Sequence, residues 1–180
     1  MSKRVLCVLA DGFEEIETVT PVDLLRRAEV EVVMATIGKS LQVTGRCGIR
    51  IEADALLADL DAGSFDLLLI PGGPAVSALR EDGRAAAMAT SFVASEKPVA
   101  AICAAPLVLA DAGLLEGKHF AAHSSVHEAL PAGLTDERVV EDGLIITSNG
   151  AGTALDFGLW LVQRMAGRTK AVEVAQAIMA

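Results

Sequence analysis

The sequence predicts an α/β fold in which an open, mostly parallel central sheet carries helices on both of its faces. Short, fully apolar segments alternate along the chain with stretches of helical periodicity. The connections between them are short and contain glycine and proline. The strand segments are apolar throughout, which is typical of parallel strands that helices cover on both sides.

The elements follow in order from the first strand, Val5–Ala10, which is continuous and apolar and ends at Asp11-Gly12. A helix follows over residues 16–27, with an apolar stripe and two arginines in its last turn. Residues 42–53, interrupted by two glycines, predict an excursion or an edge hairpin. The further predicted strands are Glu31–Ile37, Phe65–Ile70, Val99–Ile102, His119–Ala122 and Leu144–Thr147. The further predicted helices are Ala75–Leu79, Arg84–Ser95, Ala104–Ala110, Ala154–Met165 and Ala171–Met179.

Length and composition indicate one domain over residues 1–180, since a chain of 180 residues can bury a substantial core and is short for two domains. Hydrophobic residues make up 52% of the chain, yet no uninterrupted apolar run approaches the length that spans a membrane. The first residues lead directly into a strand without the features of a signal peptide. We therefore expect a cytoplasmic protein.

Charge and cysteine content exclude several classes of function. The net charge of −9 and the absence of a basic cluster argue against a nucleic-acid surface. Cys7, Cys47 and Cys103 are too few and too scattered for a disulfide framework or a zinc site. We expect reduced thiols, neither a metal nor a cofactor, and a small molecule or a protein as partner.

Cys103 is the first candidate for chemistry, because it lies between an apolar strand and a helix with no polar spacer. This layout is typical of a nucleophile elbow, in which a sharp turn presents a side chain at the carboxyl edge of the sheet. The start of the following helix favours the thiolate, which predicts a lowered pKa for Cys103. The alternative is a buried core cysteine.

Pro71-Gly72-Gly73-Pro74 follows another strand, and its glycines allow the backbone to turn N–H groups toward a ligand. Beside the Cys103 elbow, the N–H of Gly72 or Gly73 and that of Ala104 would form an oxyanion hole. The alternative is a tight turn between a strand and a helix.

Among the three histidines, His123 alone is predicted at the carboxyl edge of the sheet, because it ends the strand predicted over 119–122. His119 begins that strand at the opposite edge, and His127 falls in a short helix that follows. The alternative for His123 is a surface or capping group.

Glu17 differs from the other acidic residues at the start of the first helix. Glu14 and Glu15 lie at the start of the helix, where they complement its dipole and need no function. Glu17 lies one step further in, between apolar Ile16 and Val19. Burial beside a cysteine would raise the pKa of its carboxyl and make it a candidate general acid or base.

Four motifs together resemble the ThiJ/PfpI family, in its parkinsonism-associated deglycase (glyoxalase III-like) branch. The motifs are residues 11–23 (DGFEEIETVTPVD), 69–73 (LIPGG), 100–106 (AAICAAP) and 147–153 (TSNGAGT). They match in register over almost the whole chain. The resemblance implies a single domain, like class I glutamine amidotransferases, with a flavodoxin-like three-layer sandwich.

The resemblance also implies roles for individual residues. Cys103 is the oxidation-prone nucleophile, Glu17 its protonated carboxyl partner and His123 the nearby imidazole. The backbone donors are Gly72, Gly73 and Ala104. A homodimer is expected, with the first helix and residues 45–48 at its two-fold interface and Asp23 and Arg27 near the seam.

The rim of the site departs from the family pattern. Asn149 stands where relatives often have Arg or Gln, and Ala151 stands where they often have Pro. Ser124 stands where some relatives have Pro. The anion-contacting arginine of relatives is either Arg46 or is replaced by Cys47.

The implied activity is cofactor-free detoxification of reactive dicarbonyls, as a glyoxalase that converts methylglyoxal to lactate or as a deglycase of proteins and nucleotides. One alternative is a redox-sensing stress-response chaperone whose cysteine is oxidised to sulfinic acid. Another is a hydratase of a different small electrophile such as an isonitrile. Protease-like relatives have His directly after the nucleophile, where this chain has Ala104. Amidotransferase relatives need a His-x-Glu sequence late in the chain, and no histidine follows His127. The sequence therefore disfavours both of these activities.

Overall fold

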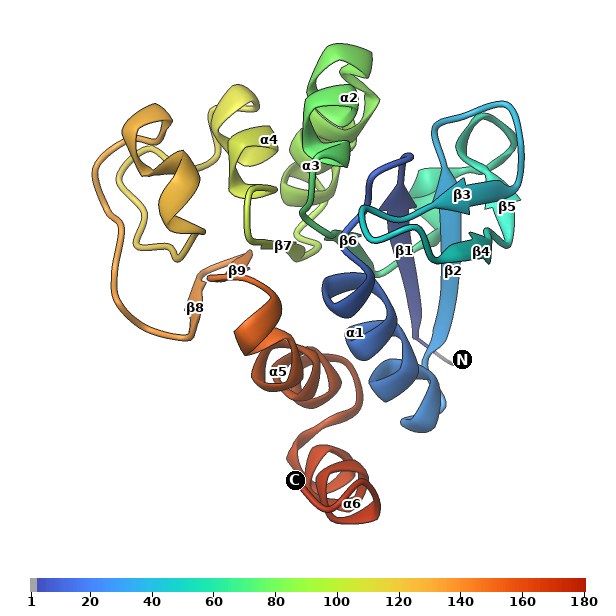
Figure 1. Cartoon of the computed structure of the whole chain (residues 1–180). Helices are drawn as coiled ribbons and strands as arrows, with labels where there is room; N and C mark the ends of the chain where they lie inside the picture. Colours follow the sequence, from blue (N-terminus) through green and yellow to red (C-terminus); the bar gives the residue numbers. More distant parts are fainter. Residues whose placement is uncertain (1–2) are drawn as a thin grey trace.

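The computed structural model describes residues 3–180, and its centre is a seven-stranded sheet in the order β5-β2-β1-β6-β7-β9-β8 (Figure 1). All neighbouring strands are parallel except β8, which runs antiparallel to β9 at one edge. The strands are β1 (Arg4–Leu9), β2 (Glu31–Thr36), β5 (Ala55–Leu56), β6 (Leu67–Ile70), β7 (Val99–Ile102), β8 (Val139–Asp142) and β9 (Ile145–Ser148). The predicted fold class is confirmed.

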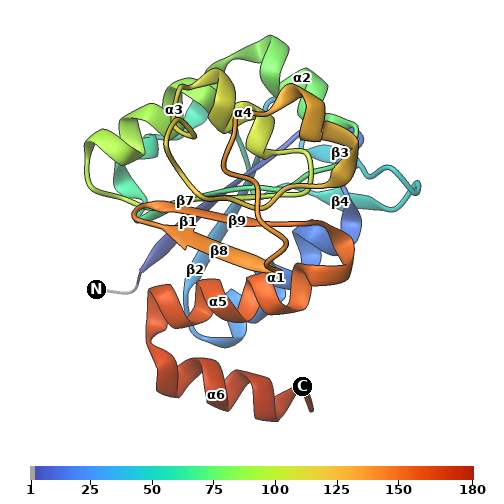
Figure 2. The ribbon, with the colours of Figure 1, turned by 90° about the vertical axis from the view of Figure 1, so that its left-hand side faces the viewer.

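Helices cover both faces of the sheet (Figure 2). One layer holds α2 (Ala75–Asp82), α3 (Arg84–Ala94) and α4 (Pro106–Asp111). The other holds α1 (Glu15–Arg27) and α5 (Ala154–Ala166), with α6 (Arg168–Ala177) packed outside α5. Residues 3–180 also contain four 3-10 turns: η1 (Leu57–Asp59), η2 (Ala62–Ser64), η3 (Ser124–Ala129) and η4 (Ala151–Thr153).

The central strands are buried because helices cover both of their sides. Every residue of β6, β7 and β9 is buried, as the fully apolar character of β6 and β7 predicts. In a parallel sheet of this kind, ligands bind at the carboxyl edge, and the turns after β1, β6, β7 and β9 meet there.

The excursion predicted over residues 42–53 is an antiparallel hairpin of β3 (Gln42–Thr44) and β4 (Arg50–Glu52), separate from the main sheet. Its backbone is tied to the turn after β1, where Gly12 N–H donates to Thr44 O and Arg46 N–H donates to Phe13 O. The hairpin therefore lies against the same edge as the turns described above.

The prediction of a strand over His119–Ala122 is wrong. Phe120 forms an isolated bridge with Leu134, and the N–H of Ala121 donates to the side chain of Thr147 on β9 rather than to a backbone carbonyl of that strand. The place beside β9 is taken by β8, which the sequence did not predict. The turn Asp142-Gly143, with Gly143 at φ +67°, allows β8 to fold back on β9.

Within residues 3–180, no helix combines the length and the apolar character needed to cross a membrane.

Candidate active site

Cys103 lies on the sharp turn between β7 and α4, with its backbone in the left-handed region at φ +67°. A non-glycine residue in such a conformation costs roughly 1–3 kcal/mol, so the surrounding structure must hold it. Two hydrogen bonds do so: Cys103 N–H donates to Ser148 O (2.9 Å), and Cys103 O accepts from His123 N–H (2.9 Å). The predicted elbow is present, and its side chain is half-buried rather than part of the core.

The carboxyl group of Glu17 reaches Cys103 from α1. Glu17 is 1% exposed, and its carboxylate accepts a hydrogen bond from the thiol of Cys103. Its Oε2 also accepts from Gly72 N–H at 3.0 Å. A Cβ atom at Gly72 would lie 2.5 Å from this oxygen and 2.6 Å from Cys103 Cβ. Glycine is therefore required where α1, β6 and β7 converge.

Burial raises the pKa of both acids. The pKa of Glu17 rises from 4.5 to about 7, mainly because burial disfavours its charge. Burial, together with the neighbouring charge of Glu17, raises the pKa of Cys103 to about 12. The prediction of a lowered pKa for Cys103 is therefore wrong while Glu17 is ionised. Burial and the Glu17 carboxylate raise this pKa by more than the backbone N–H groups of Gly73 and Ala104 lower it.

The two acids titrate as a pair that shares one proton above pH about 7. Moving this proton from Sγ of Cys103 to the Glu17 carboxyl gives a thiolate beside a neutral acid without changing the charge of the site. The backbone N–H groups of Gly73 and Ala104 point at the sulfur and favour this form. The pair can thus supply a nucleophile and, next to it, an acid.

The three predicted backbone donors have different partners. The N–H groups of Gly73 and Ala104 are directed at Cys103, whereas Gly72 N–H is taken up by Glu17. Gly73, at φ +92°, packs so closely on the turn after β1 that a Cβ atom would lie 2.6 Å from Gly12 O. Gly73 and Ala104 are therefore the donors available to an oxyanion formed beside Cys103.

His123 is exposed and faces the pair across Gly150. A Cβ atom built on Gly150 would lie 3.3 Å from His123 Cδ2, 3.6 Å from Glu17 Oε1 and 3.8 Å from Cys103 Sγ. The three predicted side chains thus surround one point. Ring atom Nδ1 of His123 accepts from Ser125 N–H (3.2 Å), so in the neutral ring the proton is on Nε2. His119 and His127 do not take part in this arrangement.

Gly150 is the functional position that the sequence analysis missed. It belongs to a motif that carried the family resemblance, but nothing in the sequence placed it beside Cys103. The turn that holds it is fixed by Thr153, whose Oγ1 accepts from Gly150 N–H (3.1 Å) and donates to Gly150 O (2.9 Å). Ser148 Oγ lies 2.6 Å from the same hydroxyl and 2.6 Å from Arg138 O.

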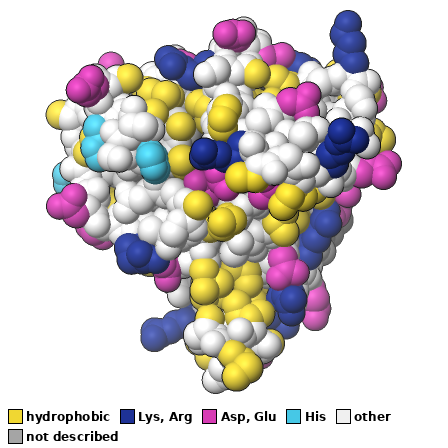
Figure 3. All heavy atoms as spheres, in the orientation of Figure 1, with side chains coloured by type: hydrophobic (Ala, Val, Ile, Leu, Met, Phe, Trp, Pro, Cys, Tyr) yellow, Lys and Arg dark blue, Asp and Glu magenta, His cyan; other side chains and the backbone are white. Residues whose placement is uncertain are grey.

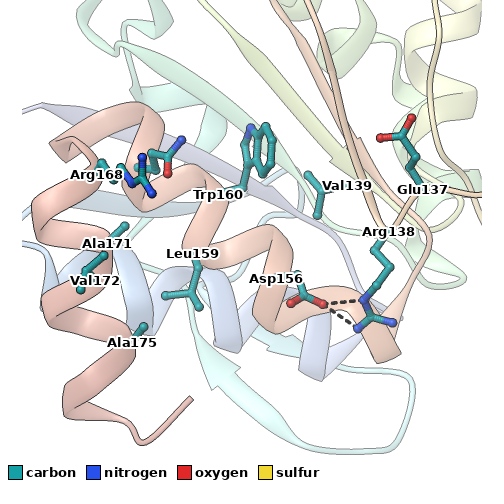
Figure 4. Close-up of a pocket in the computed structure, with 11 residues that line it drawn as sticks. Glu137, Arg138, Val139, Asp156, Leu159, Trp160, Arg168, Ala171, Val172 and Ala175 are labelled. Atoms are coloured by element: carbon teal, nitrogen blue, oxygen red, sulfur yellow. Dashed lines mark hydrogen bonds and ion pairs between the residues drawn. The ribbon is translucent and has the colours of Figure 1, made fainter.

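A cavity of about 560 Å³ lies between α5, α6 and the start of β8, and none of the predicted site residues lines it (Figure 4). Leu159, Trp160 and Val172 supply apolar surface to it. At its edge Arg138 pairs with Asp156 (2.6 Å) and also donates to Gly152 O (2.8 Å). The cavity therefore touches the turn that carries Gly150 only from outside.

Arg46, rather than Cys47, supplies the charged group at the rim. Its guanidinium lies 3.2 Å from Glu14, which is buried, and its positive charge acts to lower the pKa of Glu17. Cys47 is exposed, and its backbone N–H donates to Glu15 Oε1 (2.8 Å). Glu14 and Glu15, assigned to the helix dipole from sequence, therefore also hold the hairpin loop against the site.

The sequence is similar to those of a known protein family and of several known proteins. A model of the DJ-1/PfpI family matches residues 3–164. Protein dj-1beta of Drosophila melanogaster is 36% identical over 183 residues, covering 99% of this chain and 98% of that protein. Putative cysteine protease YraA of Bacillus subtilis is 39% identical over 151 residues, covering 82% and 89%. Protein DJ-1 homolog B of Arabidopsis thaliana is 38% identical over 181 residues, covering 97% of this chain but 40% of its own length. The chain thus spans less than half of that Arabidopsis relative.

Solved structures with similar sequences have the same fold. The crystal structure of Drosophila melanogaster DJ-1beta has a TM-score of 0.94 and 36% identity, covering 100% of this chain and 99% of that one. Oxidized Toxoplasma gondii DJ-1 also has a TM-score of 0.94, at 33% identity, covering 99% and 98%.

Proposed function

The chain belongs to the DJ-1/PfpI family, and we propose that it is an enzyme that converts reactive dicarbonyls such as methylglyoxal to hydroxy acids without a cofactor. The observation that carries this proposal is the pair formed by half-buried Cys103 and buried Glu17, which shares one proton near neutral pH. Isomerising a 2-oxoaldehyde requires a nucleophile for the aldehyde and a base that moves a proton between adjacent carbons.

The proposed reaction begins when the proton of Cys103 passes to Glu17 and the thiolate attacks the aldehyde carbon of methylglyoxal. The resulting alkoxide is stabilised by the N–H groups of Gly73 and Ala104, and it takes the proton from Glu17 to give a hemithioacetal. Glu17, now ionised, removes the hydrogen of the former aldehyde carbon as a proton and returns it to the neighbouring carbon, while the hydroxyl proton of the hemithioacetal passes to the oxygen on that neighbouring carbon. A lactoyl thioester remains, and water releases lactate and the thiol. His123 would orient the substrate oxygen through Nε2–H.

This proposal is favoured over proteolysis. The relative YraA of Bacillus subtilis is named a putative cysteine protease. A cysteine protease, however, needs an imidazole base beside its nucleophile. In this chain Nδ1 of His123 is engaged by Ser125, and ring carbon Cδ2 is the atom nearest Gly150. The group that shares a proton with Cys103 is a carboxyl.

The test is lactate formation from methylglyoxal without glutathione. We expect turnover by the unmodified protein, loss of turnover in Cys103→Ser, and wild-type turnover in the control Thr90→Val, whose hydroxyl lies exposed on α3. Equal turnover in Cys103→Ser and the unmodified protein would contradict the proposal.

A second candidate function is redox sensing, which the half-buried thiol and its two N–H donors favour. A similar structure, that of Toxoplasma gondii DJ-1, is described as oxidized. Mild peroxide is expected to add two oxygens to the protein mass through sulfinic acid at Cys103. Oxidation that persists in Cys103→Ser would remove this candidate.

A further inference from the structure

Residues 119–123 run beside the sheet without forming a strand of it, yet the N–H group of every second residue in this segment finds an acceptor there. Three hydrogen bonds, each 2.9 Å long, connect His119 N–H to Asp142 Oδ2, Ala121 N–H to Thr147 Oγ1, and His123 N–H to Cys103 O. A period of two residues is that of a β-strand. Two of the three acceptors are side chains, however, where a paired strand would offer backbone carbonyls.

Thr147 supplies the buried member of these hydrogen bonds. Thr147, on β9, and Ala121 are both 0% exposed, whereas the bond between His119 and Asp142 is exposed. Water can replace the Asp142 carboxylate at the surface, but it does not reach Ala121. A buried N–H group without a partner is unfavourable, so the position of Ala121 depends on the hydroxyl of Thr147.

The segment fixed by Thr147 ends at the residue that supports the nucleophile. His123 N–H donates to Cys103 O, which is one of the two hydrogen bonds that hold Cys103 at φ +67°. The other bond joins Cys103 N–H to Ser148 O, and Ser148 directly follows Thr147. These two neighbours on β9 therefore both support the elbow. Ser148 does so directly, and Thr147 does so through Ala121 and His123.

We propose that Thr147 is a positioning residue whose hydroxyl, by fixing Ala121, places the N–H of His123 on Cys103 O and the ring of His123 beside the site. A Cβ atom built on Gly150 would lie 3.3 Å from that ring. The effect on turnover rests on the proposed function. The placement of His123 does not, because it can be measured in the protein without substrate.

The first measurement is amide hydrogen exchange, followed by NMR. Thr147→Val keeps the shape of the side chain and removes the hydroxyl. We expect exchange to become at least about fivefold faster at Ala121 N–H and also at His123 N–H, whose own acceptor remains. The control Thr36→Val removes a buried hydroxyl from β2 that accepts from Gly38 N–H (3.1 Å), and it should leave exchange at His123 as it is. Unchanged exchange at His123 in Thr147→Val would overturn the proposal.

The second measurement is kcat/KM for methylglyoxal. It should fall about five- to tenfold in Thr147→Val, be restored in Thr147→Ser, which keeps the hydroxyl, and stay unchanged in Thr36→Val. When His123→Ala is already present, Thr147→Val should cause a smaller further loss, because the ring that Thr147 positions is then absent. Thr147→Ala provides the same comparisons if valine prevents folding.

The outcomes separate the positioning role from the proposed function. Equal losses of kcat/KM in Thr147→Val and Thr36→Val, or in Thr147→Val and Thr147→Ser, would overturn the positioning role. If the unmodified protein forms no lactate although exchange at His123 rises in Thr147→Val alone, the proposed enzymatic function fails and the placement of His123 by Thr147 stands.

Discussion

Cys103 and Glu17 acquire their properties from each other. Burial alone would hold each group in its neutral form, and the pKa values of about 12 and about 7 describe a pair that loses one proton near neutral pH and keeps the other. From sequence, burial of Glu17 was expected because its neighbours Ile16 and Val19 are apolar, and its contact with Cys103 was implied by the family resemblance. Glu17 is buried, but Ile16 and Val19 are exposed, so its burial has a different cause: it lies on the side of α1 that faces the sheet. The sequence could not predict the sign of the change at Cys103, which depends on how closely the carboxylate approaches the sulfur.

The first prediction concerns the pH dependence of alkylation. Below the pKa of Glu17 both groups are protonated, and above it the single remaining proton can move to the carboxyl and leave a thiolate. The rate of reaction of Cys103 with iodoacetamide should therefore rise as the pH passes through about 7. In Glu17→Gln the thiol must lose its proton to solvent, and the rise should move to higher pH. Peptide mapping should find no label on Cys7, which is buried and serves as an internal control. An unshifted profile in Glu17→Gln would refute the shared proton.

The second prediction concerns stability. The pKa of Glu17 is about 7 in the folded protein and near 4.5 in the unfolded chain, so the folded state binds the proton more tightly. Stability from this group is full below pH about 4.5 and is lost as the pH rises toward about 7, by up to about 3 kcal/mol. Glu17→Gln removes this loss. Its melting temperature should exceed that of the unmodified protein at pH about 8 by more than it does at pH about 5. A difference in melting temperature that does not change with pH would contradict the raised pKa.

At the scale of elements, the sequence predicted the parts with a strong periodic or apolar signal. The strand Val99–Ile102 matches β7 at both ends, and the hairpin over residues 42–53 is present. The elements that were missed, β5 and β8, are short and lie at the two edges of the sheet, where half-exposed residues give no continuous apolar run. Residues 119–122 have such a run but bury it against the side chain of Thr147 instead of pairing.

The turn between β9 and α5 leads to the third prediction. Thr153→Val leaves Gly150 N–H without its partner in a buried turn, at a cost of roughly 1–3 kcal/mol. Unfolding in urea should show this loss, and turnover should fall because Gly150 borders Cys103. Thr153→Ser keeps the hydroxyl and should restore turnover. If Thr153→Ser is as impaired as Thr153→Val, the methyl group rather than the hydroxyl positions the turn.

At the scale of the whole molecule, one face carries apolar side chains that no described residue covers. Hydrophobic spheres gather over the region of α1, α5 and α6 in Figure 3. Ile16 and Val19 on α1 are 52% and 47% exposed, and Ile49 beside the hairpin loop is 57% exposed. Asp23 and Arg27, expected near a dimer seam, form an exposed pair at 2.6 Å within this chain. We propose that this face forms a symmetric homodimer.

The fourth prediction follows from this face. Light scattering should report about twice the chain mass of 18.6 kDa, and Val19→Glu should reduce it to one chain mass. Thr90→Glu adds the same charge on α3, in the opposite helical layer, and should leave the dimer intact. A monomeric unmodified protein at micromolar concentration would refute the proposed dimer.

Turnover of methylglyoxal by Glu17→Gln tests whether the carboxyl of Glu17 moves a proton during the reaction, because this substitution keeps the shape of the side chain and removes its ability to do so. We expect lactate formation without glutathione to fall about 10²- to 10⁴-fold, while melting at pH about 8 shows a protein at least as stable as the unmodified one. Full lactate formation by Glu17→Gln would refute the proposed role of Glu17, since the carboxyl group would then take no part in the reaction.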